Sequence, residues 1–176
     1  MFACMQRSLV GVEIENGGVL MKFVQTSAET GGALHLQEAR YQARSKPPPS
    51  HCHPKQEERF VVVEGGLNFR IGGETRLVNA GDEVSVPRGV FHRAYNPHAI
   101  PALVMWETRP ALRTAEFFLS MSEASRGKAR PSLPDAAAIL LEYQDEFQPE
   151  KPSPLVRRIA LPCLALFGKR RAGSTR

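Results

Sequence analysis

Residues 51–65 read HCHPKQEERFVVVEG and residues 81–96 read GDEVSVPRGVFHRAYN, and together they carry three of the five histidines of the chain. Side chains two positions apart on a β-strand point to the same face. His51 and His53 are therefore expected to lie together, while the cysteine between them points to the other face and is a poor ligand candidate. His92 follows the Pro-Arg-Gly turn of the second stretch.

A carboxylate follows the two paired histidines at Glu57 or Glu58. Three neutral imidazoles and one carboxylate form a nitrogen and oxygen donor set that suits Fe(II), Mn(II), Ni(II), Co(II), Cu(II) or Zn(II). With a divalent ion, this set keeps one formal positive charge, which favours an anionic ligand such as an enolate, phenolate or carboxylate. The residues thus indicate a site for one divalent transition metal ion.

Both stretches resemble the two motifs of the cupin superfamily, G-x5-H-x-H-x3or4-E-x6-G and G-x5-P-x-G-x2-H-x3-N. The residues that match the first motif are His51, His53, Glu58 and Gly65, although Ser45 and three prolines stand where a leading glycine is expected. The residues that match the second motif without a gap are Gly81, Pro87, Gly89, His92 and Asn96. Within this superfamily, the chain resembles the small single-domain, metal-binding monocupins, which include quercetinase-like dioxygenases.

The resemblance implies an all-β fold, the cupin jelly-roll β-barrel. It also implies that His51, His53, Glu58 and His92 bind the metal ion from inside the barrel and leave one or two positions open. Glu58 is preferred to Glu57 because only Glu58 keeps the six-residue spacing to the motif glycine. The candidates for lining the substrate site are Gln56, Phe60, Val62 and Asn96.

Each of these interpretations has a simpler alternative. The four motif residues could belong to a degenerate, metal-free cupin. Phe60 and Val62 could be barrel lining, and Asn96 could fix a loop. His35 and His98, outside both motifs, are expected to be satisfied core residues.

Short apolar runs separated by glycine pairs predict about eight antiparallel strands, the number typical of a jelly roll. The predicted strands are residues 19–24, 34–41, 60–63, 67–71, 75–78, 83–86, 92–96 and 102–106. Helical periodicity then predicts helices at 114–125, 136–147 and 155–167, with Pro162 kinking or dividing the last one. The expected division is a cupin β-barrel domain at 1–112 and a helical C-terminal extension with a basic tail at 113–176.

The length of 176 residues and a 42% hydrophobic composition fit one folded domain. The leading hypothesis is a mononuclear, dioxygenase-type oxidoreductase that acts on a small oxygenated metabolite. The alternatives are a metal-dependent isomerase, cyclase or lyase, and a non-catalytic module that binds a small molecule. No catalytic residue beyond the metal ligands is assigned.

The formal net charge of +5 is concentrated at one end of the chain. Residues 151–176 hold seven Lys and Arg and no Asp or Glu, which leaves residues 1–150 at −2. This segment could contact an anionic membrane or an acidic partner, or could be a solvated tail whose apolar face packs on the barrel. Nucleic-acid binding is not expected, because helix-turn-helix and basic-aromatic patterns are missing.

Homodimerisation is expected through residues 10–24, which would otherwise form an exposed sheet edge. The three cysteines are far apart and form no Cys-x-x-Cys pair. A cytoplasmic protein is expected, since the start of the sequence does not resemble a secretory signal and the apolar run 159–167 is too short to span a bilayer.

Overall fold

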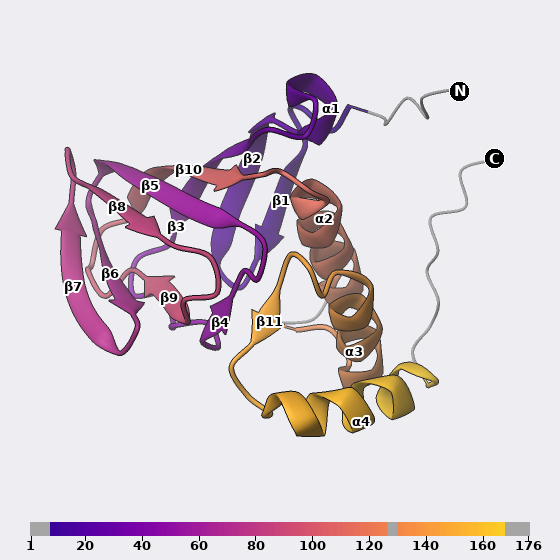
Figure 1. The fold of residues 1–176 in the computed structure, drawn as a ribbon. Coiled ribbons are helices and arrows are strands. Elements are labelled where there is room, and N and C mark those ends of the chain that lie inside the picture. The colour runs from indigo at the N-terminus through magenta and orange to yellow at the C-terminus, as the bar shows by residue number, and fades with distance from the viewer. Residues whose placement is uncertain (1–7, 127–129, 168–176) are drawn as a thin grey trace.

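The structure, a computed structural model, describes residues 8–126 and 130–167, and consists of two antiparallel sheets followed by helices (Figure 1). Sheet A has the strand order β1 (Glu13–Asn16), β2 (Val19–Gln25), β3 (His35–Tyr41), β10 (Ala102–Arg109), β5 (Glu57–Glu64) and β8 (Glu83–Val86). Sheet B has the order β11 (Gln148–Pro149), β4 (His51–Cys52), β9 (His92–Tyr95), β6 (Gly66–Ile71) and β7 (Glu74–Asn79). This is the cupin jelly roll that the sequence predicts.

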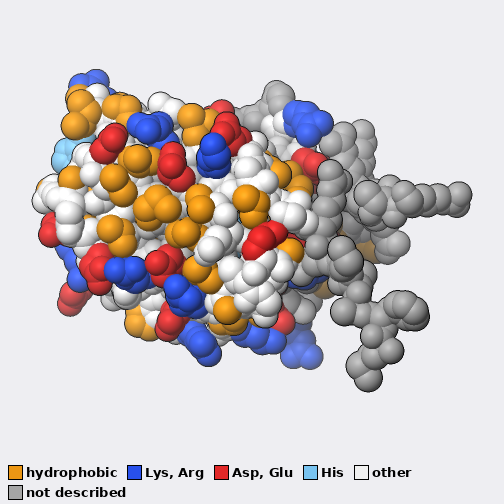
Figure 2. Space-filling model, turned by 90° about the horizontal axis from the view of Figure 1, so that it is seen from above, with side chains coloured by type: hydrophobic (Ala, Val, Ile, Leu, Met, Phe, Trp, Pro, Cys, Tyr) orange, Lys and Arg blue, Asp and Glu red, His pale blue; other side chains and the backbone are white. Residues whose placement is uncertain are grey.

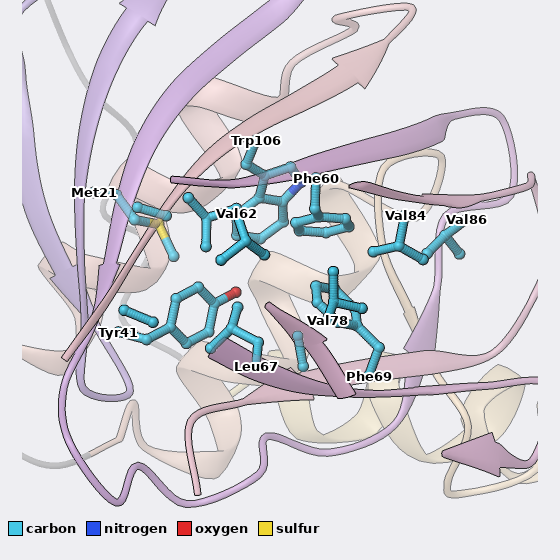
Figure 3. Packing of buried hydrophobic residues seen from close by; sticks show 14 of the residues in the cluster. Met21, Tyr41, Phe60, Val62, Leu67, Phe69, Val78, Val84, Val86 and Trp106 are labelled. Atoms are coloured by element: carbon cyan, nitrogen blue, oxygen red, sulfur yellow. The ribbon is translucent and has the colours of Figure 1, made fainter. Parts of the chain in front are cut away.

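The core lies between the two sheets, because each long strand buries every second side chain. Phe60 and Val62 of sheet A point toward Leu67 and Phe69 of sheet B (Figure 3). The rings of Phe60 and Phe69 meet edge to face with centroids 5.0 Å apart. These inward side chains close one end of the barrel interior with hydrocarbon.

Gly65 makes the turn between β5 and β6 and has a φ of +72°. A Cβ atom at this position would lie 2.7 Å from the carbonyl oxygen of Pro101. Only glycine tolerates both the left-handed backbone and this close approach. The last glycine of the first motif is therefore required by the fold.

Within residues 8–126 and 130–167, all eight strands predicted from apolar runs are present, and β1, β4 and β11 lie outside those predicted ranges. A strand at His51 is expected only from its spacing to His53, and β4 is shorter than that, because it ends at Cys52. β11 has two residues, which is too short for alternation to reveal it. Leu20 of β2 and Val63 of β5 are exposed hydrophobic residues of sheet A. The face of the molecule in Figure 2 mixes hydrophobic and charged side chains. This mixture is ordinary for one face of an antiparallel sheet.

The helices are α1 (Ser27–Thr30), α2 (Thr114–Ser125), α3 (Leu133–Glu142) and α4 (Pro154–Ala165). The prediction for α2 has the observed bounds, whereas α3 begins and ends earlier than the predicted 136–147. It begins after Ser132, whose hydroxyl accepts a hydrogen bond from the Asp135 amide at 3.3 Å. Pro162 is exposed and lies inside α4, so it does not divide this helix, and a kink at this position stays a prediction. No helix in the described ranges is long and apolar enough to cross a membrane.

The chain beyond α3 returns to sheet B. We call residues 143–150 the strap. Within it β11 pairs with β4, placing Gln148 opposite Cys52 and Pro149 opposite His51. The amide of Glu150 donates to the carbonyl oxygen of Ser50 at 2.8 Å. The strap therefore adds an edge strand directly beside the first motif histidine (Figure 1).

Candidate metal centre

Three histidines from neighbouring segments of sheet B meet at one end of the barrel interior. His51 on β4 and His92 on β9 are direct partners in the ladder, and His53 follows β4 immediately. One ring nitrogen from each histidine lies within 4.8 Å of the other two. The local alternation predicted for His51 and His53 and the pairing of β4 with β9 together produce this cluster.

Each of the three rings has its Nδ1 atom next to a backbone carbonyl oxygen. The distances are 3.1 Å from His51 to Pro49, 3.0 Å from His92 to Val90 and 2.5 Å from His53 to Glu146. A carbonyl oxygen only accepts hydrogen bonds, so Nδ1 carries the proton in each neutral ring. The Nε2 atom of each histidine therefore keeps the lone pair that a metal ligand needs.

Glu58 reaches this cluster from β5 in the opposite sheet. Its carboxylate oxygens lie 3.1 Å from Nε2 of His53 and 2.8 Å from Nε2 of His92, and the side chain is fully buried. Glu58 is outside the group of three mutually close histidines but touches two of its members. Trp106 holds the carboxylate in place, because its indole Nε1 donates to Oε1 at 3.0 Å.

The donor atoms in this cluster fit a cation. Nε2 of His53 and Oε2 of Glu58 are buried and have no aligned hydrogen-bond partner among the described residues. Two facing groups that both present lone pairs repel each other unless a proton or a metal ion lies between them. The arrangement can therefore hold a divalent ion through the predicted residues His51, His53, Glu58 and His92, and their role as ligands remains a prediction.

The electrostatics of the cluster favour the ligating form of His51 and of Glu58. Burial, together with the neighbouring His92 and His53, lowers the pKa of His51 to about 3, so this ring is neutral at pH 7. Burial by itself would raise the pKa of Glu58, but the two nearby imidazoles outweigh it and hold that pKa well below its usual range. Burial also disfavours a charged His92, yet the adjacent Glu58 raises its pKa overall.

The strap covers the histidine cluster. The ring of Phe147 stacks on His51 with centroids 4.4 Å apart, and it stacks on Phe117 of α2 at 5.0 Å. The buried carboxylate of Glu146 accepts a hydrogen bond from the Arg113 amide at 3.1 Å, at the start of α2. The helical extension thus supplies both an aromatic cover for the site and the carbonyl oxygen that orients His53.

The strap was not predicted from the sequence, since Glu146 lies 93 positions from His53 and no motif connects them.

A buried polar row across sheet A was not predicted either. Thr108 on β10 pairs with His35 on one side and with Glu58 on the other. His35 is buried as expected, but its Nδ1 has no partner within the described ranges, and Oγ1 of Thr108 also has none. The prediction that His35 is a satisfied core residue is therefore wrong for this atom.

Each of the four predicted lining residues contacts other residues of the fold, either through hydrogen bonds or through apolar packing. Gln56 donates from its amide to the Thr114 hydroxyl at 2.7 Å and to two backbone carbonyls, which ties the start of α2 to the barrel. Asn96 donates to the carbonyl oxygen of Ile100 at 2.7 Å and so fixes a loop. Phe60 and Val62 belong to the apolar core. Contact of these four with a substrate remains a prediction.

A hollow of about 190 Å³ lies on the outer face of sheet A, and its lining includes the exposed residues Glu57, Ser85 and Arg109. Glu58 is also part of this lining, but its side chain is only 1% exposed and lies against the histidine cluster. The hollow therefore does not give access to the carboxylate of Glu58.

Comparison with known proteins agrees with this architecture. The family model of the cupin domain matches residues 38–106. The tetracenomycin polyketide synthase protein TcmJ of Streptomyces glaucescens is 32% identical over 60 residues, which cover 34% of this chain and only 40% of that protein.

Solved structures show the same fold at low sequence identity. An RmlC-like cupin from Shewanella frigidimarina has a TM-score of 0.52 and 18% identity over 65% of this chain and 96% of that one. The cupin domain of Cnp3 from Schizosaccharomyces pombe has a TM-score of 0.50 and 14% identity over 70% of this chain and 80% of that one. At these identities, the likeness concerns the fold alone.

Proposed function

Since this chain belongs to the cupin superfamily, we propose that it is a metal-dependent enzyme, a mononuclear dioxygenase-type oxidoreductase that acts on a small oxygenated metabolite. The observation that carries this proposal is the cluster of three histidines whose Nδ1 atoms are committed to backbone carbonyls, with a buried carboxylate beside them. A divalent ion bound there supplies Lewis acidity and a position for O2 or for substrate oxygens.

The residues of the chain have distinct roles in this proposal. His51, His53 and His92 hold the ion through Nε2, and Glu58 contributes the negative charge that Trp106 orients. Phe147 and Phe117 exclude water from one side of the cluster. The donor set leaves a positive site, so the substrate binds as an enolate, phenolate or carboxylate. The description of TcmJ as a polyketide synthase protein supports a polyketide-like substrate, since such compounds are rich in carbonyl and enol oxygens.

The test uses untagged protein purified from cells and analysed for metal by plasma mass spectrometry. We expect about one divalent ion per chain. Reconstitution with Fe, Mn, Ni or Co, followed by oxygen-electrode measurements on enediols and flavonols, is expected to reveal O2 consumption. Absence of O2 consumption with every metal would overturn the dioxygenase assignment. Anaerobic turnover would identify an isomerase, cyclase or lyase, and ligand binding without turnover would identify a binding module.

We also propose a boundary near Leu112, between a barrel at 1–112 and an extension at 113–176. It is supported by the end of β10 at Arg109 and the start of α2 at Thr114.

We also propose homodimerisation through residues 10–24, which is supported by the position of β1 at the edge of sheet A. Gel filtration is expected to give a dimer, and a monomer at micromolar concentration would contradict it. We also propose a cytoplasmic location, because Cys52 and Cys163 are unpaired and free thiols are typical of a reducing compartment.

A further inference from the structure

Helix α4 and the turn after it expose an unusual amount of hydrocarbon. We call Leu155, Val156, Ile159, Leu166 and Phe167 the outer face of α4. Their side chains are between 48% and 83% exposed, whereas most large hydrophobic residues of the strands are buried. Exposed apolar residues on a soluble surface are usually scattered, and a contiguous group marks an interaction site.

The outer face is continuous because of helical geometry. Leu155 and Ile159 are four residues apart and lie on one side of the helix. Leu166, the C-cap residue, follows Ile159 by seven residues and keeps a helical backbone conformation, so it continues the same side. The opposite side holds Arg157, which is buried and donates to the carbonyl oxygen of Pro149 and to the Gln148 side chain. The contacts of Arg157 with the strap thus fix the rotation of α4 so that its apolar side faces outward.

The position of α4 leaves this face uncovered. The helix packs against α3 and contacts the edge strand β11 of sheet B through Arg157, and it lies below both in Figure 1. Ile159 is 66% exposed and Phe167 is 80% exposed. The apolar side of α4 is therefore not packed on the barrel. The alternative expectation, a solvated tail whose apolar face packs on the barrel, is wrong for these side chains.

Within residues 151–176, the charge has one sign. Residues 151–176 hold seven basic and no acidic residues. Lys151 and Arg158 are exposed in the structure, while Lys169, Arg170 and Arg171 lie outside the described residues and follow Phe167 closely in sequence. Two copies of this segment facing each other would repel, whereas an anionic surface would attract it.

We propose that the outer face of α4 docks on an anionic membrane surface. The helix lies in the plane of the interface, with its apolar side chains inserted below the phosphate level and the flanking Lys and Arg paired with headgroup phosphates. Apolar burial and basic attraction act together in such helices, and each signal alone gives weak, reversible binding. This inference stands independently of the proposed chemistry at the histidine cluster.

The test is co-sedimentation of the full chain with vesicles, either of phosphatidylcholine alone or with about one third phosphatidylserine. We expect binding to the anionic vesicles only, weakened strongly by about 0.5 M NaCl, because salt screens the basic residues. Ile159→Glu places a carboxylate in the outer face and is expected to weaken binding by about tenfold or more. Replacing Lys169, Arg170 and Arg171 by Gln is expected to lower both the affinity and its salt dependence.

Ile100→Glu is the matched control, because Ile100 is 62% exposed but lies between β9 and β10. It is expected to bind vesicles as the unchanged chain does. Equal binding by the Ile159→Glu and Ile100→Glu variants would overturn the proposal, as would failure of the unchanged chain to bind anionic vesicles. Light scattering that shows self-association lost only in Ile159→Glu, without vesicle binding, would instead identify the face as an interface between copies. Circular dichroism and metal content, read on every variant, separate loss of binding from misfolding.

Discussion

The two ends of the barrel interior are built on opposite principles. Around Phe60 and Phe69, the sheets meet mainly through hydrocarbon. Around Glu58, the same sheets bring together buried donors and acceptors, and several atoms have no partner within the described ranges. The first end stabilises the fold by packing, and the second keeps polar atoms that packing alone would not favour. Such a contrast is typical of a fold that supports a site at one end.

Truncation at the apolar end should have the largest effect on stability. Phe69 is fully buried between the sheets, so Phe69→Ala removes apolar contacts and leaves a cavity. We expect the free energy of unfolding to fall by about 3–5 kcal/mol, measured by urea titration. The metal content per folded molecule should stay unchanged. A loss below about 1 kcal/mol would show that this end is not the stabilising one.

A substitution at the polar end should act mainly on metal affinity rather than on stability. Glu58→Gln keeps the shape of the side chain but removes the charge, so we expect metal affinity to fall by about 100-fold. The metal-free protein should lose some stability as well, because the fold holds the pKa of Glu58 well below its usual range and so favours the charged carboxylate that this substitution removes. Competition with a chelator measures the affinity, and thermal unfolding measures the stability.

Glu57→Gln is the control for this experiment, since Glu57 is adjacent and exposed. It should leave metal affinity unchanged. Equal effects of the two substitutions would mean that the carboxylate of Glu58 is not a ligand.

Removing the aromatic cover should have an intermediate effect. Phe147→Ala breaks the stack on His51 and on Phe117. We expect a loss of stability of about 1–3 kcal/mol and faster release of metal to a chelator. Phe167→Ala removes a ring that is 80% exposed and should change neither quantity. If Phe147→Ala released metal at the rate of the unchanged chain, the strap would not control access to the site.

The smallest effect on stability should come from breaking an exposed ion pair between the barrel and the strap. Lys55 and Asp145 form an ion pair at 2.7 Å, and both side chains are more than half exposed. Lys55→Ala should cost at most about 0.5 kcal/mol, because water and salt screen such pairs. Differential scanning calorimetry would detect a larger loss, which would show that this ion pair, rather than Phe147, holds the strap in place.

Much of the fold and part of the site follow from local sequence. Short apolar runs between glycine pairs predict β3 and β10, and the helical period predicts the bounds of α2, because these patterns depend on residues a few positions apart. By contrast, the exact start of α3 depends on the Ser132 cap, and the two-residue strand β4 carries no readable period. Short or capped elements are therefore where prediction from sequence lost accuracy.

The sequence by itself determined the jelly roll, the spacing of His51 and His53 and the preference for Glu58, because alternation and motif spacing are local properties of the chain. Only the tertiary structure decided that Trp106 orients Glu58, that the strap covers His51 and that α4 turns its apolar side outward. The hydrogen bond from Trp106 to Glu58 joins residues 48 positions apart, and the one between His53 and the strap residue Glu146 joins residues 93 positions apart. No local pattern encodes such pairings, since they arise when sheets and helices pack and select among the partners that burial makes available.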